Sequence, residues 1–394
     1  MSGDYVQAEG LYACIAMVNK IDKIGTDTVY SYKNDGTIKI NGICPYFCIC
    51  FLLLISCLLF LAGCSTTSSM QGKEALSSPI IWPPPPEQAR ISYEGVIERP
   101  EDAETKKGFF RKVVEFLLGK TEDRIIRPYG VAVDNMERLI VVDTAFKRVH
   151  IFDRGKGAYT WFDEFNNNGF TSPIAVAVDS QDNIYVSEPA LNKVVVFNKK
   201  GKYLFEIKDG LHRPTGLAVN NIERLLYVVN TGGHNVSVYN LTGKLYYTFG
   251  QRGKERGMFN YPTDIFIDRE GLVYVTDSLN FRIQIFDKSG KFVSMFGRHG
   301  DGSGSFARPK GVAVDSNGNI YVVDALFDAV QIFNRQGDLL LGFGSSGQEK
   351  GSFWLPSGIF VDGKDRIYVA DSYNRRVQIF KYLKEENKLS KEAK

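Results

Sequence analysis

Cysteine is absent from most of this chain, because all six cysteines lie within its first 64 residues. They are Cys14, Cys44, Cys48, Cys50, Cys57 and Cys64. The remainder therefore folds without disulfide bonds or thiolate metal ligands. Histidine is also scarce, and the four histidines, at positions 150, 212, 234 and 299, have no metal-ligand spacing. An excess of charge of one sign is lacking too: 48 basic residues face 45 acidic ones, so we expect no binding to nucleic acid.

Five of the cysteines lie in one uncharged stretch, CPYFCICFLLLISCLLFLAGCS, at residues 44–65. Lysines precede the stretch, and it ends in LAGC (61–64) before a run of serine and threonine. This pattern resembles the lipobox of bacterial lipoproteins, which implies cleavage before Cys64 and a lipid on its thiol. We therefore expect a leader at residues 1–63 and a membrane contact through the N-terminal lipid. The expected location is the bacterial cell envelope, facing the periplasm or the exterior.

Two alternatives for the apolar stretch stay open. It is long enough to cross a bilayer without being cleaved, because about 20 apolar residues suffice. A zinc or redox site made from Cys44, Cys48 and Cys50 would lack histidine or acidic partners. The long polar segment before the apolar core is unusual for a bacterial signal peptide. We hypothesise that translation starts downstream of Met1 and that residues 1–38 are not made, which a peptide from this region in a mass spectrum would contradict.

The residues after the lipobox lead from a tether into a folded domain. Residues 64–88 are rich in serine, threonine and proline, and the four prolines at 83–86 favour a stiff polyproline II stalk. Within residues 89–126, ARISYEGVI (89–97) has the alternation of a strand, and KKGFFRKVVEFLLGK (106–120) that of a basic amphipathic helix. Such a helix docks on its own domain or lies on a membrane surface, and we favour docking.

From residue 127 onward the chain is a repeat. Six units open with a proline, at intervals of 41 to 48 residues: Pro128, Pro173, Pro214, Pro262, Pro309 and Pro356. Each unit continues with a second and a third apolar run, such as IYVVD and VQIF, and the first five add a fourth, such as KLYYTFG (244–250). Four short strands with turn residues at this interval predict an all-β fold, a six-bladed β-propeller over residues 127–382.

The sixth unit lacks a fourth strand, because a charged tail at residues 383–394 ends the sequence soon after Phe380. An open blade would leave an unpaired edge, which folded proteins avoid. The strand-like segment 89–97 lies before the first repeat and has no other partner. We expect it to form the outer strand of the sixth blade and to close the ring.

The amino-acid sequence of the repeat resembles the NHL-repeat family over residues 127–380. RPKGVAVDSNGNIYVVDALFDAVQIF (308–333) and LPSGIFVDGKDRIYVADSYNRRVQIF (355–380) carry the resemblance best. Three connectors share the spacing G-x2-G-x3-G-x-F-x2-P, as in GQRGKERGMFNYP (250–262), whereas repeats two and three have shorter joins. The resemblance implies the propeller fold, but propellers host unrelated activities, so it leaves the function open.

Any binding site is expected on one face of the propeller. Alternate turns of antiparallel strands lie on opposite faces, and one face has only tight Asp/Gly turns such as DSNGN (315–319). The other face carries the longer loops between second and third strands and the connectors between blades, where binding residues gather. Each of these loops begins with one of Asp143, Glu188, Asn230, Asp277, Asp324 and Asp371. These side chains form a carboxylate ring or accept hydrogen bonds from their own loops, and their repetition favours the second role.

The variable loop positions are the better binding candidates. They are Lys147, Arg148, Lys193, His234, Phe281, Arg282, Phe327, Asp328, Arg375 and Arg376, to which the connectors add His212, Arg213, Arg252, Arg256, Arg298 and His299. Basic and aromatic groups dominate this set, which suits an anionic glycan, a peptidoglycan fragment or an acidic protein segment.

Catalysis has little support in the sequence. Related propellers include a peptidyl-hydroxyglycine amidating lyase that holds a metal with histidines, and lactonases that hold one with Glu, Asn and Asp. Here the residues after the repeat prolines are Tyr129, Ile174, Thr215, Thr263, Lys310 and Ser357, and Asp264 is the only acid nearby. No G-x-S-x-G motif, Cys/His pair or phosphate-binding loop occurs. We expect no cofactor and no enzyme activity, with a metal-dependent lyase or lactonase-like enzyme at the central channel as the alternative.

These observations predict a membrane-anchored lipoprotein whose propeller is a non-catalytic scaffold or sensor for an envelope protein, peptide or glycan. If the basic loop residues bind the partner, reversing the charge of Arg282, Arg375 and Arg376 abolishes its capture. Because all three are expected on the surface, the same change should leave thermal stability nearly unchanged.

Overall fold

The computed structural model describes residues 79–103 and 123–384. The leader, the lipobox with Cys64, most of the tether, the amphipathic segment 106–120 and residues 385–394 lie outside the described residues. Within the described ranges, no helix is long and apolar enough to span a membrane.

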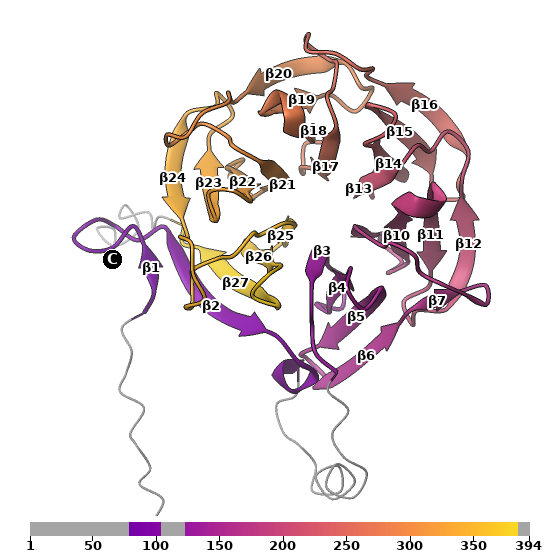
Figure 1. Ribbon diagram of the computed structural model, residues 1–394, viewed down its shortest axis with the longest axis horizontal. Coiled ribbons are helices and arrows are strands. Elements are labelled where there is room, and N and C mark those ends of the chain that lie inside the picture. Colours follow the sequence, from indigo (N-terminus) through magenta and orange to yellow (C-terminus); the bar gives the residue numbers. More distant parts are fainter. Residues whose placement is uncertain (1–78, 104–122, 385–394) are drawn as a thin grey trace, which may run out of the picture. The chain divides into compact units, whose positions relative to one another are not determined.

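The repeats form six antiparallel sheets around a central channel (Figure 1). From the inner strand outward, the first three blades are β3 (Pro128–Val133), β4 (Leu139–Asp143), β5 (Arg148–Asp153), β6 (Ala158–Phe162); β9 (Val176–Val178), β10 (Ile184–Glu188), β11 (Lys193–Phe197), β12 (Tyr203–Ile207); and β13 (Pro214–Asn220), β14 (Leu225–Asn230), β15 (Asn235–Asn240), β16 (Leu245–Phe249). The others are β17 (Pro262–Ile267), β18 (Val273–Asp277), β19 (Arg282–Phe286), β20 (Phe292–Phe296); β21 (Pro309–Val314), β22 (Ile320–Asp324), β23 (Ala329–Phe333), β24 (Leu339–Phe343); and β25 (Ile359–Val361), β26 (Arg366–Asp371), β27 (Arg376–Tyr382). The predicted all-β six-bladed propeller is confirmed.

Short elements complete the described chain. They are the hairpin β7 (Glu164–Phe165) and β8 (Asn168–Gly169) in the connector before blade 2, and the 3-10 helices η1 (Pro100–Ala103), η2 (Pro189–Leu191) and η3 (Ser278–Asn280). This hairpin lies in the connector between blades 1 and 2, at the place where the connectors before blades 4, 5 and 6 have the glycine-rich motif.

The ring closes through strand β2 (Ile91–Ile97), which pairs antiparallel with β27 of blade 6. Ile91 and Ile97 at the ends of β2 are buried, so the strand contributes apolar side chains as well as hydrogen bonds. The N-terminal strand therefore supplies the outer strand that the sixth repeat lacks, as predicted. Joining both ends of the domain in one sheet removes the edge that blade 6 would otherwise expose.

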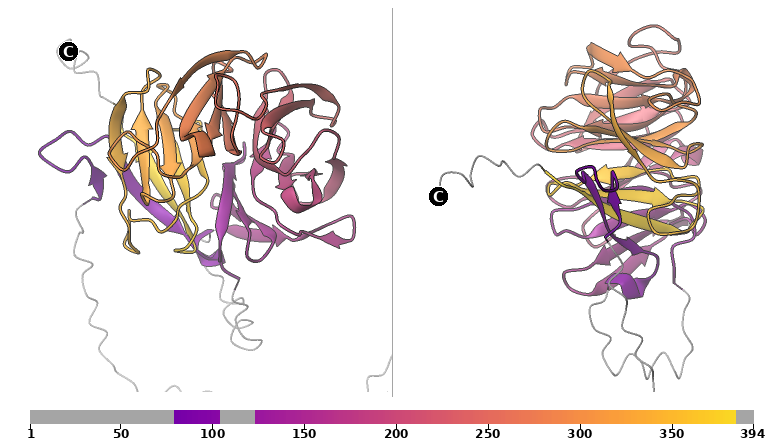
Figure 2. Two further views of the ribbon diagram at one scale, coloured as in Figure 1. Left: turned by 45° about the horizontal axis from the view of Figure 1, so that its top comes forward. Right: turned by 90° about the vertical axis from the view of Figure 1, so that its left-hand side faces the viewer.

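The end of the expected tether belongs to the folded domain. Strand β1 (Ile81–Trp82) pairs with β2 as a fifth strand of blade 6. The Trp82 ring lies 5.7 Å from the rings of both Phe343 and Phe380. Prolines 83–86 form the loop of this hairpin, which projects from the rim of the propeller (Figure 2). The expectation of a straight stalk up to residue 88 is therefore wrong for residues 79–88, because Trp82 buries a large aromatic surface against blade 6.

The glycine and phenylalanine spacing of the connectors fills the gaps between neighbouring blades. Phe259 is fully buried, and its ring lies 6.4 Å from Phe249 of blade 3 and 5.5 Å from Phe286 of blade 4. The arrangement recurs at Phe306 and Phe353. Gly250 has a φ of 85°, and a Cβ there would lie 2.3 Å from the Phe259 ring. Only glycine leaves room for this ring, so the shared spacing is a packing signal.

Candidate functional site

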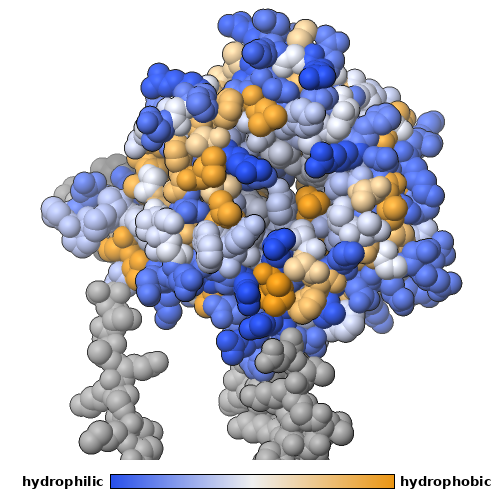
Figure 3. Space-filling model, in the orientation of Figure 1, coloured by the Kyte–Doolittle hydropathy of each residue, from blue (hydrophilic) through white to orange (hydrophobic). Residues whose placement is uncertain are grey.

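The two faces of the propeller differ as the sequence predicted. The loops between second and third strands and the connectors share one face, here called the loop face, and the tight Asp/Gly turns share the other. In the space-filling view, separate apolar patches alternate with hydrophilic side chains around a central opening (Figure 3). Scattered apolar patches of this kind are normal on a folded protein, so they do not by themselves mark a binding site.

The residues that begin the loops are structural. All six are fully buried: Asp143, Glu188, Asn230, Asp277, Asp324 and Asp371. Their side chains accept hydrogen bonds mainly from backbone N–H groups of the connector that enters the same blade, as Asp277 does from Asn260 at 2.7 Å and Asp371 from Trp354 at 2.8 Å. Asp143 and Asp324 also accept from their own loops. The predicted bonds from the residue's own loop are present at Asp143 and Asp324, and at the other positions the backbone donors belong to the connector instead.

Arg282 and Arg376 are buried in equivalent ion pairs. The Arg376 Nε donates to Asp371 Oδ2 at 2.7 Å, and its terminal nitrogen donates to the carbonyls of Glu349 and Ser352 at 2.8 and 2.9 Å. Arg282 makes the same bonds in blade 4. The expectation that these two arginines lie on the surface is therefore wrong. Since a buried carboxylate left without its partner is strongly destabilising, we now expect charge reversal here to lower stability.

Arg148 and Lys193 occupy the same strand position in blades 1 and 2 and are also engaged. The Arg148 guanidinium lies 4.1 Å from the centre of the Trp161 ring, and its terminal nitrogen is 3.4 Å from an Asp123 oxygen. The Lys193 ammonium donates to Glu206 at 2.8 Å. Each cation is thus partly neutralised by its own blade, which lowers its value for binding an external anion.

His234 and Asp328 bind the next blade. Both have positive φ, and each accepts the backbone N–H of the residue before the following repeat proline: Tyr261 at 3.2 Å and Leu355 at 2.7 Å. Asn192 does the same for Arg213 at 2.7 Å, and all three residues that donate these N–H groups have positive φ. The equivalent residues Lys147, Phe281 and Arg375 make no such bond among the described residues. The residues before the next repeat prolines, Ser172, Arg308 and Arg127, are not among those of positive φ. The side chain at this loop position therefore sets how the chain enters the next blade.

The remaining predicted residues differ in exposure. The Phe281 ring packs on His299 with 4.4 Å between ring centroids, and Phe327 is half-buried in its loop. Arg375 is exposed and makes no ion pair within the described part of the chain, so its role in binding stays a prediction.

The mouth of the channel on the loop face is a cavity of about 470 Å³. The residues after the repeat prolines line it, because these residues begin the innermost strands: Tyr129, Ile174, Thr215, Thr263 and Lys310. The threonine hydroxyls are used between blades, since Thr215 donates to the Thr263 carbonyl at 2.9 Å and Thr263 to the Lys310 carbonyl at 3.0 Å. Lys310 and Arg213 are the charged donors of this cavity, and neither makes an ion pair among the residues that the structure describes.

Lys310 is the most unusual of these groups. It is partly buried, and this burial, with the nearby charge of Arg308, lowers the pKa of its ammonium to about 8. Its nitrogen lies 5.9 Å from the centre of the Tyr129 ring, and no carboxylate forms an ion pair with it within residues 79–103 and 123–384. Burial raises the pKa of the Tyr129 hydroxyl to about 12, so that ring stays neutral. The sequence places Lys310 at the channel, after a repeat proline, but gives no sign that its ammonium is partly buried, so it was not among the predicted binding residues.

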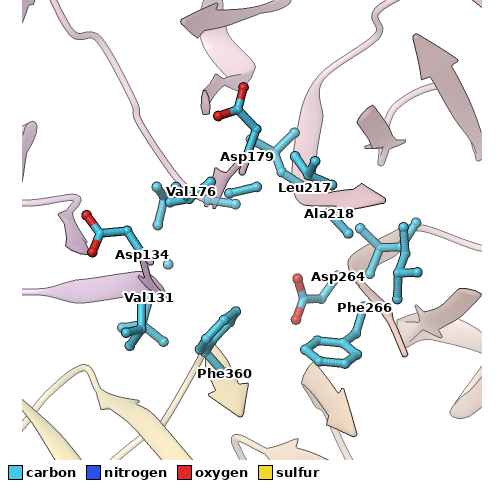
Figure 4. Close-up of a pocket in the computed structure, with 18 of the residues that line it drawn as sticks. Val131, Asp134, Val176, Asp179, Leu217, Ala218, Asp264, Phe266 and Phe360 are labelled. Atoms are coloured by element: carbon cyan, nitrogen blue, oxygen red, sulfur yellow. The ribbon is translucent and has the colours of Figure 1, made fainter. Parts of the chain in front are cut away.

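Further along the channel, toward the face with the tight turns, lies a second cavity of about 240 Å³, here called the inner cavity, with Asp264 in its wall (Figure 4). The other five repeats have glycine or alanine at this position: Gly130, Ala175, Gly216, Gly311 and Gly358. The Asp264 carboxylate accepts the Val312 N–H of the next blade at 3.1 Å, and burial raises its pKa to about 7. No three His, Cys, Asp or Glu side chains of the described residues come together as metal ligands do.

Comparison with known proteins agrees with this architecture. The model of the family DUF5128, described as a 6-bladed beta-propeller, matches residues 269–337, and that of the NHL repeat matches residues 353–380. No curated protein matches the chain.

Solved structures share the fold at low identity. A streptogramin B lyase is 13% identical, with a TM-score of 0.52 over 66% of this chain and 94% of its own. An auxiliary nutrient binding protein from Bacteroides thetaiotaomicron is 14% identical, with a TM-score of 0.52 over 67% of this chain and 71% of its own. Such likeness establishes the fold alone. Its repeats, its closure and these matches together identify the chain as a six-bladed β-propeller that carries an NHL repeat at residues 353–380.

Proposed function

We propose that this propeller is a non-catalytic binding module, which recognises an anionic group of its partner at the mouth of the channel on the loop face. The observation that carries the proposal is Lys310, a partly buried ammonium that lines an open cavity and has no ion pair among the described residues. Arg213 shares the cavity, and Arg308 lies close enough to lower the Lys310 pKa. An unpaired cation in a poorly solvated site attracts a carboxylate or phosphate more strongly than an exposed cation does.

The partner is an acidic segment of an envelope protein, an acidic peptide or an anionic glycan. We place the module in the bacterial cell envelope, held at the membrane by a lipid on Cys64. The lipobox pattern around Cys64 supports this location. A domain anchored there can present its loop face to partners at the same membrane.

A metal-dependent lyase or lactonase-like enzyme is the second candidate. The lyase with a similar structure supports the fold only, at 13% identity. Elemental analysis of the purified protein separates the two functions. One equivalent of a divalent metal, retained through gel filtration, would contradict a purely binding role.

A labelled hexaglutamate peptide tests the mouth directly by fluorescence anisotropy. We expect Lys310→Met to weaken binding at least about tenfold at pH 7, the low end for loss of a charge-assisted contact. We also expect binding to the native protein to fall as the pH rises through about 8, because Lys310 loses its proton there. The matched control is Lys200→Met, which removes an exposed lysine from the opposite, tight-turn face. Equal affinity of the two variants would contradict the proposal.

A further inference from the structure

The inner cavity is a site of a different character from the mouth. Part of its wall is apolar, with the side chains Val131, Val176, Leu217, Ile265 and Ile359, whereas Asn135 and Asn221 add polar groups at its end toward the tight turns. Asp264 points its carboxylate into the cavity (Figure 4). Asp134 and Asp179, which border the same cavity, are committed elsewhere: Asp134 pairs with Arg138 at 2.6 Å, and Asp179 accepts from Asn183 at 2.9 Å. One carboxylate of the cavity is therefore available to a ligand.

Two aromatic rings stand beside this carboxylate. Phe266 and Phe360 occupy a position on the innermost strand where the other four blades carry alanine: Ala132, Ala177, Ala218 and Ala313. Their ring centroids are 6.3 Å apart with an interplanar angle of 62°, and both rings border the cavity (Figure 4). They come from blades 4 and 6, on either side of the small Ala313 of blade 5. Blades 4 and 6, which depart from the repeat at this position, therefore place an aromatic ring each at the cavity, and blade 4 also carries Asp264.

These groups select a kind of ligand. A calcium ion needs six to eight oxygen ligands and a magnesium ion a full octahedron, which one carboxylate cannot supply. An organic ammonium needs one anion and gains further from the faces of aromatic rings. The volume is below the about 300 to 1,000 Å³ of sites for drug-sized molecules, so the ligand is small.

We propose that the inner cavity binds a small primary alkylammonium, with its charged group at Asp264 and its alkyl chain against Phe266, Phe360 and the apolar wall. This site goes beyond the proposed function, because it takes a cation where the mouth takes an anion. The isolated carboxylate is costly to ionise in an apolar wall, and the ammonium removes that cost by pairing with it.

Binding is then coupled to the ionisation of Asp264. Burial holds its pKa at about 7, and a cation binds only the ionised form. The other titratable groups that face it are Tyr129 of blade 1, which stays neutral, and the two committed carboxylates Asp134 and Asp179. Lys310 lies on the adjacent strand β21 and belongs to the mouth.

Calorimetric titration with n-butylammonium tests the site, because this probe stays cationic between pH 6 and pH 8. For a carboxyl with a pKa of about 7, the ionised fraction rises about tenfold over this interval, so we expect about tenfold tighter binding at pH 8. Asp264→Asn should abolish binding at both pH values, since its amide cannot pair with a cation. The Asn side chain keeps an oxygen for the Val312 N–H, so this variant should stay folded.

Two further measurements make the result decisive. Phe360→Ala restores the residue that four blades already carry and should weaken n-butylammonium several-fold without changing the pH dependence. Neutral n-butanol should bind the native protein more weakly and equally at both pH values. No measurable binding of n-butylammonium to the native protein, equal binding by folded Asp264→Asn, or equal affinity for n-butanol at pH 8 would each overturn the proposal.

Discussion

Replacing Arg376 by alanine tests whether the buried loop arginines stabilise the fold or serve to bind a partner. The Arg376 guanidinium is only 6% exposed and donates to Asp371, Glu349 and Ser352. Its loss leaves one carboxylate and two carbonyls of the connector without these donors. Breaking a buried ion pair by removing one partner destabilises by about 3–5 kcal/mol. For a domain of this size, that corresponds to a fall in Tm of about 6–20 °C.

The loss should also depend on pH. Burial already raises the pKa of Asp371, although Arg376 and its other hydrogen bonds lower it. Without the arginine the folded-state pKa rises further above its value in the unfolded chain. Stability is then fully present below the unfolded pKa and is lost as the pH rises through the folded one. We therefore expect Arg376→Ala to be less destabilised at pH 4.5 than at pH 8, because Asp371 takes up a proton and removes its own unpaired charge.

Guanidinium denaturation followed by circular dichroism at both pH values measures this effect. The control is Arg375→Ala, one residue away, whose side chain is exposed and should change stability by less than about 0.5 kcal/mol. If the two variants unfold at the same denaturant concentration, Arg376 has no structural role and its buried hydrogen bonds contribute nothing to the free energy of unfolding. A loss independent of pH would show that Asp371 does not respond to its partner.

Three further predictions follow from other parts of the chain. Asp264→Asn should be more stable than the native protein at pH 8 and about equal to it near pH 4. The reason is that the Asp264 pKa is raised from 3.8 to about 7, so the native protein loses stability as the pH rises through 7. The difference in the free energy of unfolding, from thermal unfolding, should be at most about 4 kcal/mol, and an equal gain at both pH values would contradict the prediction. Ile97→Ala should destabilise the protein by about 2–5 kcal/mol, because it removes a buried side chain of the closing strand β2. In the same denaturant titrations, Glu94→Ala on that strand should have little effect, because Glu94 is exposed. Equal effects of the two variants would mean that β2 does not close the ring. Cys64→Ser should move the protein from the membrane to the soluble fraction after cell fractionation, and retention of this variant in the membrane would favour an uncleaved span.

Much of the fold could be predicted because the repeat is long and regular. The intervals between prolines indicated the number of blades, and the missing fourth strand of the last unit indicated that an earlier segment closes it. These features depend on local strand and turn signals and on the requirement that no edge stays unpaired. Trp82 was missed because a lone tryptophan before four prolines has no repeat pattern to place it, and only its packing on Phe343 and Phe380 does so.

The binding residues were harder to predict for a physical reason. Arg375 and Arg376 are adjacent and chemically alike, yet Arg375 is exposed in the turn, with a φ of 59°, and Arg376 is buried at the first position of β27. His234 and Asp328 look like surface groups, but the next blade brings a backbone N–H within their reach.

The sequence by itself determined the all-β class, the six repeats, the closing strand and the face that carries the long loops, because each follows from the order of strands and turns along the chain. Only the tertiary structure decided which charged groups are free. Lys310 and Asp264 lie on different repeats, at the first and second positions after the repeat proline, and they become site residues because the innermost strands converge at the axis. That convergence removes water from around them and shifts their pKa values toward neutrality, which no local pattern can encode.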